Sequence, residues 1–384
     1  MPRCLLVTKE FSLTPTSGGM LRTLALAEQL RTQYETTVVS PQGVWVADRG
    51  GEYVPAALQT RADGRWGRLP AVSDLTRYRS ISGVRTGGRS LLRNIAAGAH
   101  GHYDLGVLDH TCLAGLTDAL AIGCSTVVVS MHNVESDLMA QRAAAATDAR
   151  EKAVMTLETR LLRRLESHVV QSYPVVVCTE ADAEVLAAGH RAERLIVCRN
   201  GIFPNPNPPA ANRRPHSMVF SGALDWQPNT AGLVWFAEQV WGLIRAELPD
   251  AEATIAGRNP EPGVLQALDR PGLNVLANPP VMATVVEAHP LGIVPLLSGG
   301  GSRIKILEYM ASGVDVVSTD VGASGLEDIP DTFVDRLPID PRLFADRVVQ
   351  RLRDPRDNAV AAQDWVRKNY AWDVTLQPLL DAVD

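Results

Sequence analysis

The 384-residue chain lacks the patterns that mark membrane, secreted and zinc-binding proteins. It has no apolar run approaching the roughly 18 residues of a membrane-spanning helix, and its start, MPRCLLVTKEF, reaches the charge of Lys9 too early for a signal peptide. Its five cysteines show no CxxC spacing, so we expect neither a zinc site nor a disulfide framework. These absences predict a cytoplasmic protein.

Two nucleotide-binding signatures are also missing. A Walker A loop needs GxxxxGK followed by Ser or Thr, and the chain does not contain it. After the first apolar segment, which ends at Thr8, the chain reads KEFSLTPTSGG, so the GxGxxG fingerprint of dinucleotide-binding proteins is absent there. Kinase and dehydrogenase functions therefore lose their main support. The net charge of −6 argues against a general nucleic-acid binder.

Short apolar runs alternate with longer amphipathic segments along the chain. This alternation predicts the α/β class, with two doubly wound Rossmann-like domains facing a central cleft. We expect a first domain over 1–200, a Pro- and Asn-rich linker over 201–217, a second domain over 218–360, and a C-terminal helix over 361–384 that packs back on the first domain. The longer predicted helices are Met20–Tyr34, Ser136–Gln171, Ala231–Leu248 and Ile304–Ala311.

Residues 61–93 contain eight arginines against two aspartates. Such a segment can be a surface for an anionic acceptor or for membrane headgroups, or it can be a solvated, mobile loop. We favour the loop, because no clear apolar face accompanies the charge. Membrane association is therefore not indicated.

The most informative stretch is LSGGGSRIKILEYMASGVDVVST, in which three glycines lead into a predicted helix. The backbone N–H groups of Gly300, Gly301 and Ser302 can converge on an anion, and the helix N-terminus adds partial positive charge. Arg303 and Lys305 add two full charges, so this loop predicts a diphosphate site.

Glu308 interrupts the apolar stripe of that helix. Ile304, Leu307 and Ala311 share its helical spacing, so we expect a buried carboxylate that needs partners. Ribose hydroxyl groups would serve as donors. The alternative is a plain salt bridge back to Lys305.

Several motifs, in their order and spacing, resemble one enzyme family. The chain is similar to GT-B fold glycosyltransferases of the large retaining group called family 4, in the branch with GGGTR-type loops. The resemblance covers nearly the whole length and rests on TSGGMLRTLALAEQL, MHNVES, CTEADA, FSGALDWQPN, AGRNP and GGGSRIKILEYMASGVDVVSTDVGASGLE. The family often has two glutamates eight positions apart, and here the first of these positions, Gly300, is glycine.

The resemblance implies roles for individual residues. His132, near the transferring sugar, and the cations Arg303 and Lys305 are the expected catalytic residues. Donor binding is expected from Gly18, Gly19, Arg22, Arg258, Met282, Gly300, Gly301, Ser302 and Glu308. Acceptor-side candidates are Asp109, His110, Asn133 and Glu135, although the Asp109–His110 pair could equally be a strand terminus.

The expected activity is sugar transfer from a UDP- or GDP-sugar to a small-molecule or glycan acceptor, with retention of anomeric configuration. Arginine, lysine and helix dipole already neutralise a diphosphate and no DxD element is present, so we expect no metal and no other cofactor. Two alternatives remain at this point. The chain could be a nucleotide-sugar epimerase on the same fold, or a non-catalytic partner subunit that binds sugar nucleotides.

Overall fold

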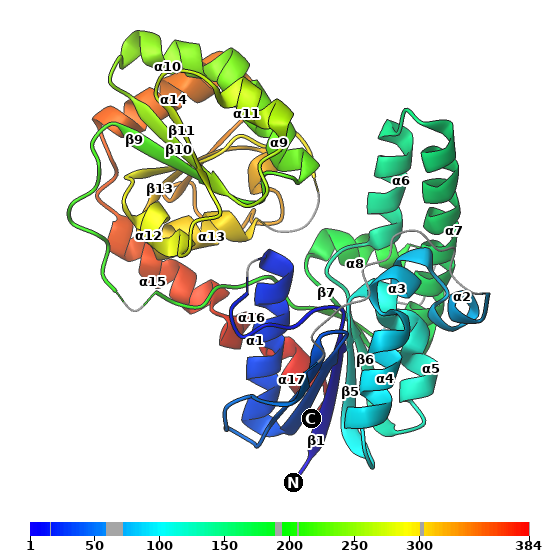
Figure 1. Cartoon of the computed structure of the whole chain (residues 1–384). Helices are drawn as coiled ribbons and strands as arrows, with labels where there is room; N and C mark the ends of the chain where they lie inside the picture. Colours follow the sequence, from blue (N-terminus) through cyan, green and yellow to red (C-terminus); the bar gives the residue numbers. More distant parts are fainter. Residues whose placement is uncertain (16, 59–71, 189–193, 206, 300–302, 384) are drawn as a thin grey trace. The chain divides into compact units, whose positions relative to one another are not determined.

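A computed structural model describes residues 1–15, 17–58, 72–188, 194–205, 207–299 and 303–383 (Figure 1). The chain divides into two compact units. The first unit comprises Met1–Arg199 together with Thr375–Asp384, and the second comprises Asn200–Val374. Gly300, Gly301 and Ser302 lie outside the described residues.

The first unit is built on an eight-stranded sheet with the order β4-β3-β2-β1-β5-β6-β7-β8. The strands β1, β2 and β5 to β8 pair in parallel, whereas β3 and β4 add an antiparallel edge that the sequence pattern did not predict. The strands are β1 (Arg3–Thr8), β2 (Glu35–Ser40), β3 (Gly43–Ala47), β4 (Val54–Leu58), β5 (Tyr103–Asp109), β6 (Cys124–Ser130), β7 (Val175–Val177) and β8 (Leu195–Val197).

Helices cover this sheet. Ser17 caps α1 by accepting a hydrogen bond from the Met20 N–H, so the helix begins two residues before the predicted start. The segment 136–171 is largely helical, as predicted, and it consists of two helices, because the first ends at Ala145 and Asp148 caps a new one. The helices are α1 (Gly18–Gln33), α5 (Thr117–Leu120), α6 (Glu135–Ala145), α7 (Ala149–Ser172), α8 (Glu180–Ala187) and α17 (Gln377–Val383).

Most of the arginine-rich segment that the structure describes is helical, so the interpretation as a solvated loop is wrong for residues 72–78, 81–86 and 88–93. It forms α2 (Val72–Tyr78), α3 (Ile81–Thr86) and α4 (Gly88–Gly98). Tyr78 and Leu91 are fully buried in the core of the first unit. Glu158 of α7 accepts hydrogen bonds from the backbone of Ile81 and Ser82 at the start of α3. A few apolar anchors therefore suffice to order a strongly basic segment.

The second unit has a six-stranded, entirely parallel sheet with the order β11-β10-β9-β12-β13-β14. The helix predicted over 231–248 contains a π-helical turn at Phe236–Val240. The strands are β9 (Ser217–Ser221), β10 (Glu252–Gly257), β11 (Leu273–Ala277), β12 (Leu291–Val294), β13 (Asp315–Thr319) and β14 (Val334–Leu337). The helices are α9 (Gln227–Trp235), α10 (Trp241–Glu247), α11 (Pro262–Leu268), α12 (Met282–Glu287), α13 (Ile304–Ala311), α14 (Pro341–Arg353), α15 (Ala359–Tyr370) and α16 (Trp372–Thr375).

The C-terminal segment is three short helices rather than the one predicted over 361–384. The backbone N–H of Ile202 donates to Tyr370 and that of Trp372 donates to Ile202. These bonds keep α15 in the second unit, together with the segment 201–217 that was predicted as a linker. Only residues 375–384 belong to the first unit.

Each sheet has one point where the strand order reverses. In the first unit β1 lies between β2 and β5, and in the second unit β9 lies between β10 and β12. Loops that leave the carboxyl ends of strands on either side of such a point diverge, which opens a crevice for ligands. Both candidate sites described below lie at these positions. Among the helices of the described residues, none is both long and apolar enough to cross a membrane.

Candidate functional site

In the first unit, Asp109 forms the centre of a buried polar cluster at the switch point between β1 and β5. It is the last residue of β5 and is fully buried. Thr8, at the end of β1, donates from its hydroxyl to Asp109 Oδ2 at 3.2 Å, and Thr23 of α1 donates to the same oxygen at 2.6 Å. The strand end and the helix that follows β1 are therefore both tied to one carboxylate.

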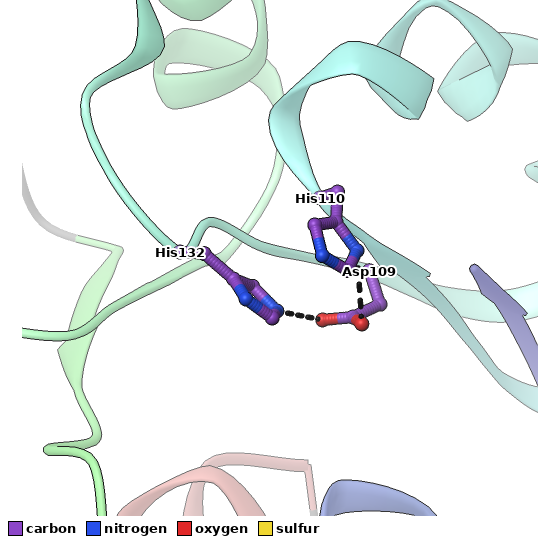
Figure 2. A group of neighbouring side chains, drawn as sticks. All are labelled: Asp109, His110 and His132. Carbon is purple, nitrogen blue, oxygen red and sulfur yellow. Dashed lines mark hydrogen bonds and ion pairs between the residues drawn. The ribbon is translucent and has the colours of Figure 1, made fainter. Parts of the chain in front are cut away.

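Two histidines complete the cluster (Figure 2). His132, which follows β6, places Nε2 2.9 Å from Asp109 Oδ1, and His110 places Nδ1 3.1 Å from Asp109 Oδ2. The two imidazole rings stack, with centroids 3.8 Å apart and planes inclined by 24°. Because β5 and β6 are neighbours in parallel register, the residues that follow them meet at one edge of the sheet.

The protonation of the cluster follows from its burial. Burial alone would raise the pKa of the Asp109 carboxyl, but His132 and His110 hold it well below its usual range, so Asp109 is an anion. Burial, together with the neighbouring His132, lowers the pKa of His110 to about 3. His110 is therefore neutral at physiological pH and has one bare ring nitrogen.

His110 has a backbone conformation that is rare for a residue with a side chain, with φ at +85°. Such strain costs about 1–3 kcal/mol and persists where the surrounding structure enforces it. The N–H of His110 donates to Ser130 of β6 at 2.7 Å, and its carbonyl accepts from the N–H of Leu113. Hydrogen bonds on both sides thus hold the ring against Asp109 and His132.

The remaining first-unit candidates lie around this cluster. Gly18 and Gly19 are not a loop but the first two residues of α1. A side-chain carbon built on Gly19 would lie 3.8 Å from His132 Nδ1 and 4.0 Å from His110 Nε2, so the structure brings Gly19 and both histidines together. Asn133 and Glu135 follow His132 and share a 3.4 Å hydrogen bond.

Arg22, which was predicted to bind the donor, is not open to a ligand in the first unit. Only 1% of it is exposed, and its guanidinium donates to the backbone carbonyl of Arg199 at 3.4 Å. It links α1 to the end of the first unit's last sheet strand.

In the second unit, the predicted cations lie at the switch point between β9 and β12. Arg303 is the N-cap of α13 and Lys305 lies in its first turn. Arg303 is buried, and burial lowers its pKa to about 10. Gly299, on the way from β12 to this helix, has φ at +118°, and a side-chain carbon there would come within 3.1 Å of the Arg303 guanidinium. A glycine is required at this position for both reasons.

The Lys305 ammonium is held by residues that follow β9. Its Nζ donates to Asn229 Oδ1 at 3.0 Å and lies 4.0 Å from the centre of the Phe220 ring. Gly222, with φ at +154°, leaves room for it, because a side-chain carbon at Gly222 would come within 3.1 Å of Nζ. The lysine as a whole is half-buried, yet its ammonium end is enclosed. Burial, reinforced by Arg303 and opposed by Glu308, lowers the pKa of Lys305 to about 7.

The predicted placement of Glu308 needs correction. The buried face of α13 consists of Ile306, Leu307, Tyr309, Met310 and Ala311. Glu308 is half-buried, on the other side of the helix, beside the half-buried Ile304. It therefore does not lie in the apolar stripe. Burial raises its pKa and the nearby Lys305 opposes that effect. Within the described residues, the two do not form an ion pair within 4.0 Å.

Arg258 and Met282 lie at the same sheet edge. Arg258 follows β10 with its side chain exposed, and its carbonyl accepts from the N–H of Leu224, which follows β9. Met282 begins α12 and packs partly buried against the apolar cluster that contains Ile306 and Leu307. Its role would therefore come from the backbone and from helix packing.

The ring nitrogens and carboxylate of Asp109, His110 and His132 lie within 4.8 Å of one another, close enough in principle to surround a metal ion. Their orientation argues against it. A metal lies in the plane of each imidazole that ligates it, and two rings stacked at 24° do not share such a point nearby. The carboxylate is also occupied by donors on both oxygens.

Sequence analysis did not identify Thr8, Thr23, Phe220 or Asn229 as site residues. A signal exists for each of the first two: Thr8 ends a strand, and Thr23 lies one helical turn after Gly19. Asn229 belongs to the quoted motif FSGALDWQPN, but its contact with Lys305 joins residues 76 positions apart and has no local signal.

The second-unit site lies in the part of the chain that matches a family model. Residues 215–354 match the family model described as glycosyl transferases group 1. A Klebsiella pneumoniae protein described as an uncharacterized 44.6 kDa protein in cps region is 30% identical over 118 residues. These residues cover 28% of this chain and 30% of that protein, so the similarity spans under a third of the relative's length.

Solved structures share the fold over the whole chain. The sucrose-phosphate synthase of Thermosynechococcus elongatus has a TM-score of 0.68 at 13% identity and 100% coverage of both chains. A UDP-forming α,α-trehalose-phosphate synthase of Burkholderia xenovorans in complex with glucose-6-phosphate has a TM-score of 0.65 at 12% identity, with 99% of each chain covered. WaaG, a glycosyltransferase involved in lipopolysaccharide biosynthesis, has a TM-score of 0.64 at 12% identity, with 99% of this chain and 98% of that chain covered.

At identities this low the likeness concerns the fold alone, and it agrees with the two Rossmann-like units described above. The predicted GT-B fold is confirmed. The chain thus has the fold of the GT-B glycosyltransferases, and its residues 215–354 match the family model described as glycosyl transferases group 1.

Proposed function

We propose that this protein transfers a sugar from a nucleoside-diphosphate sugar to a hydroxyl group of a small-molecule or glycan acceptor, with retention of anomeric configuration. One observation carries the proposal. Arg303 is the N-cap of α13 and Lys305 lies in its first turn, at the switch point of the sheet in the part of the chain that matches the glycosyl transferases group 1 model. This is the place in an open α/β sheet where a diphosphate is bound.

The diphosphate assignment rests on charge. When the bond between the anomeric carbon and the diphosphate breaks, negative charge grows on the departing phosphate oxygens. The two groups that contact the Lys305 ammonium, Asn229 and the Phe220 ring, are neutral. The charge of the ammonium is therefore available to an anion. Fixed cations and helix N–H groups stabilise the developing charge without reorganisation.

The sugar assignment rests on the first unit. His132 is oriented by the buried Asp109 anion, which takes the proton-bearing Nε2 and leaves Nδ1 directed at Gly19. The other ring nitrogen is a hydrogen-bonding partner for a sugar hydroxyl, which can donate or accept. In the proposed reaction the acceptor oxygen forms the new bond to the anomeric carbon, and its proton passes to the departing phosphate oxygen.

UDP is the first nucleotide to test, because one fold neighbour is a UDP-forming synthase. We propose that the reaction needs no metal and that it takes place in the cytoplasm. All five cysteines carry free thiols, which supports a reducing compartment.

The direct experiment is a thermal-shift screen of UDP, GDP, ADP and CDP, since a ligand of the native state raises Tm by mass action. The matching nucleotide sugars are then incubated with a panel of acceptors, and the anomeric configuration of the product is read by NMR. We expect a shift with one nucleoside diphosphate, its loss in Arg303→Ala, and a retained product. Donor conversion without any acceptor would instead identify an epimerase, and binding without turnover on every acceptor would identify a partner subunit.

A further inference from the structure

The start of α6, just after the segment that carries His132, is capped by a residue of another helix. Val134 is the N-cap of α6, and its side chain makes no capping hydrogen bond. The first N–H groups of a helix need partners outside the helix. The N–H of Ser136, the second residue of α6, donates to Glu166 Oε1 at 3.1 Å. Glu166 belongs to α7, which packs beside α6 (Figure 1).

This cap helps to hold the segment that follows β6. The N–H of Met131 donates to β7 at 2.8 Å, which fixes the chain just before His132. Beyond His132, the carbonyl of Asn133 accepts a long hydrogen bond of 3.4 Å from the Thr111 hydroxyl. The 3.1 Å bond to Glu166 follows at the start of α6. The sheet therefore fixes the beginning of this segment, and Glu166 fixes its end.

The Glu166 carboxylate is costly in this place. The residue is 3% exposed, and burial raises its pKa to about 7. Hydrogen bonds from Ser136 oppose this rise, whereas the carboxylates of Glu135 and Asp137 add to it. A neutral glutamine would accept the same hydrogen bond from Ser136 without the cost of a buried anion. The need for a cap therefore does not explain why this residue is an acid.

The titratable groups on the neighbouring elements are mostly acidic. Those that act on Glu166 or on its α6 neighbours are Glu135 and Asp137 of α6, Arg163 of α7, Asp182 of α8 and Cys112 of the 3₁₀ turn η1 (Thr111–Leu116). The Arg163 guanidinium lies 3.7 Å from the carboxylate of Asp137, so it offsets that charge. Proton uptake by Glu166 relieves repulsion within this group.

A second buried glutamate of α7 gives a direct comparison. Glu158 lies eight residues before Glu166 and is also 3% exposed. It caps α3 by accepting from the N–H groups of Ile81 and Ser82, at 2.7 and 2.9 Å, and from the Ser82 hydroxyl at 2.6 Å. Three donors compensate a buried carboxylate, so a structural role accounts for Glu158. The donors to Glu166 within the described residues come from Ser136.

We propose that Glu166 is a positioning residue for the first-unit site. Through Ser136 its carboxylate fixes the start of α6 and holds His132 and Asn133 in place, and proton uptake by Glu166 loosens this hold. An anion strengthens the hydrogen bond from a helix N-terminus, which is what a glutamine could not do. The protein therefore keeps a carboxylate that costs stability because its charge orders the site. The catalytic part of this inference rests on the proposed function.

The first test is Glu166→Gln, with Glu158→Gln as the matched control. Folding raises the pKa of Glu166, so its anion costs stability above the unfolded pKa of about 4.3, and in full above pH 7. At pH 8, Glu166→Gln should therefore keep or raise Tm, whereas Glu158→Gln should lower it.

Activity should change in the opposite sense. At pH 8 and saturating nucleotide sugar, Glu166→Gln should lower kcat by about 3- to 10-fold. Wild-type kcat should fall by a similar factor from pH 8 to pH 6, and this fall should be absent in Glu166→Gln but present in Glu158→Gln. The proposal is overturned if the fall persists in Glu166→Gln, or if that variant loses Tm and activity together.

The second test needs no substrate, so it separates this inference from the proposed function. In protein labelled with nitrogen-15 serine and asparagine, the amide signals of Ser136 and Asn133 should shift with a midpoint near pH 7. Ser136→Ala and Asn133→Gln assign the two signals, and Glu166→Gln should abolish both titrations. A Ser136 signal that does not titrate would refute the cap as a switch. Titration of Ser136 with an unchanged Asn133 would show that the cap does not reach the site.

Discussion

Lys305 Nζ donates a 3.0 Å hydrogen bond to Asn229 Oδ1 while lying 4.0 Å from the centre of the Phe220 ring. Both partners are neutral, and the charge of Arg303 disfavours the charge on Lys305. Glu308 favours the charge, but burial outweighs it, so the pKa of Lys305 falls to about 7. The protein therefore fixes the position of the Lys305 ammonium without fully stabilising its charge. A bound anion would supply the missing stabilisation.

This relationship predicts a pH-dependent affinity for UDP. Below pH 7 Lys305 is charged before UDP binds, whereas above pH 7 binding must bring a proton to the amine. UDP affinity should therefore fall by up to about tenfold per pH unit between pH 7 and 9, a range in which the charge of UDP is constant. Calorimetry in two buffers of different ionisation enthalpy measures the proton uptake directly. A flat profile in the wild type, or the same slope in Lys305→Met, would contradict the prediction.

Removing either cation should reduce catalysis. Arg303→Ala and Lys305→Ala each remove a charge-assisted contact worth roughly 1.5–3 kcal/mol, so donor-dependent kcat/KM should fall about 10- to 150-fold. Lys368→Ala, which removes an exposed cation on α15, is the control and should be neutral. Wild-type kinetics in both site variants would show that the donor diphosphate does not bind at the N-terminus of α13.

The alternation of apolar runs was enough to predict two doubly wound units, because strands buried on both faces read as short apolar segments. The helix Ile304–Ala311 has the predicted bounds. The antiparallel strands β3 and β4 were missed for different reasons. The edge strand β4 has exposed residues at 54–56, whereas β3 is buried but its five residues are too few to show a period. The helices over 72–98 were missed because a few buried residues, such as Tyr78 and Leu91, outweigh the arginines around them.

The candidate site was predicted in part for a similar reason. Asp109, His110 and His132 were candidates through the family resemblance, and all three lie at or just after strand ends, where parallel strands bring their carboxyl ends together. Their mutual contact and the link from Lys305 to Asn229 depend on packing between distant segments, which no local pattern encodes. The prediction for Glu308 was wrong because the buried face of α13 is not the stripe through Ile304, Leu307 and Ala311 that the spacing favoured. The buried face is centred on other residues of the helix, and Glu308 lies outside it.

A buried ion network in the second unit gives a stability prediction. Asp335 of β14 is 5% exposed and pairs with Arg347, Arg351 and Arg356. Burial alone would raise the pKa of Asp335, but these arginines lower it below its usual value. The network therefore stabilises the fold above the unfolded pKa of about 3.9, and this contribution is lost as pH falls through the lower folded pKa. Asp335→Asn should lower the free energy of unfolding at pH 7 by about 3–5 kcal/mol. The free energy of unfolding of the wild type and of Asp335→Asn is measured in urea at pH 7 and pH 3. A difference between the two proteins that does not shrink at pH 3 would contradict the prediction.

Catalysis should survive removal of metal ions. The proposed charge stabilisation comes from Arg303, Lys305 and the N-terminus of α13, and the stacked histidines are poorly oriented to ligate a cation. Dialysis against EDTA should leave kcat within about twofold. Complete loss that Mg²⁺ or Mn²⁺ restores would show that the site needs a metal after all.

The last prediction concerns Asp109→Asn, which keeps the shape of the side chain but makes one of its two oxygens an amide. Oδ2 meets two hydroxyls and His110 Nδ1, whereas Oδ1 meets only His132 Nε2. The amide nitrogen should therefore face His132, because the other side holds more donors. His132 must then accept at Nε2 and carry its proton on Nδ1, which reverses the hydrogen bond that it offers a sugar hydroxyl.

We expect Asp109→Asn to fold and to lose kcat/KM by about 100-fold or more, as a catalytic imidazole does in the wrong tautomer. Nitrogen-15 NMR should show the protonated nitrogen of His132 moving from Nε2 to Nδ1. Thr23→Val provides the comparison, since it also removes a hydrogen bond to Asp109 but leaves the contact with His132 in place. It should lower stability by about 1 kcal/mol and leave the tautomer unchanged. If Asp109→Asn loses activity while His132 keeps its proton on Nε2, Asp109 acts through its charge on the substrate and not by positioning the histidine.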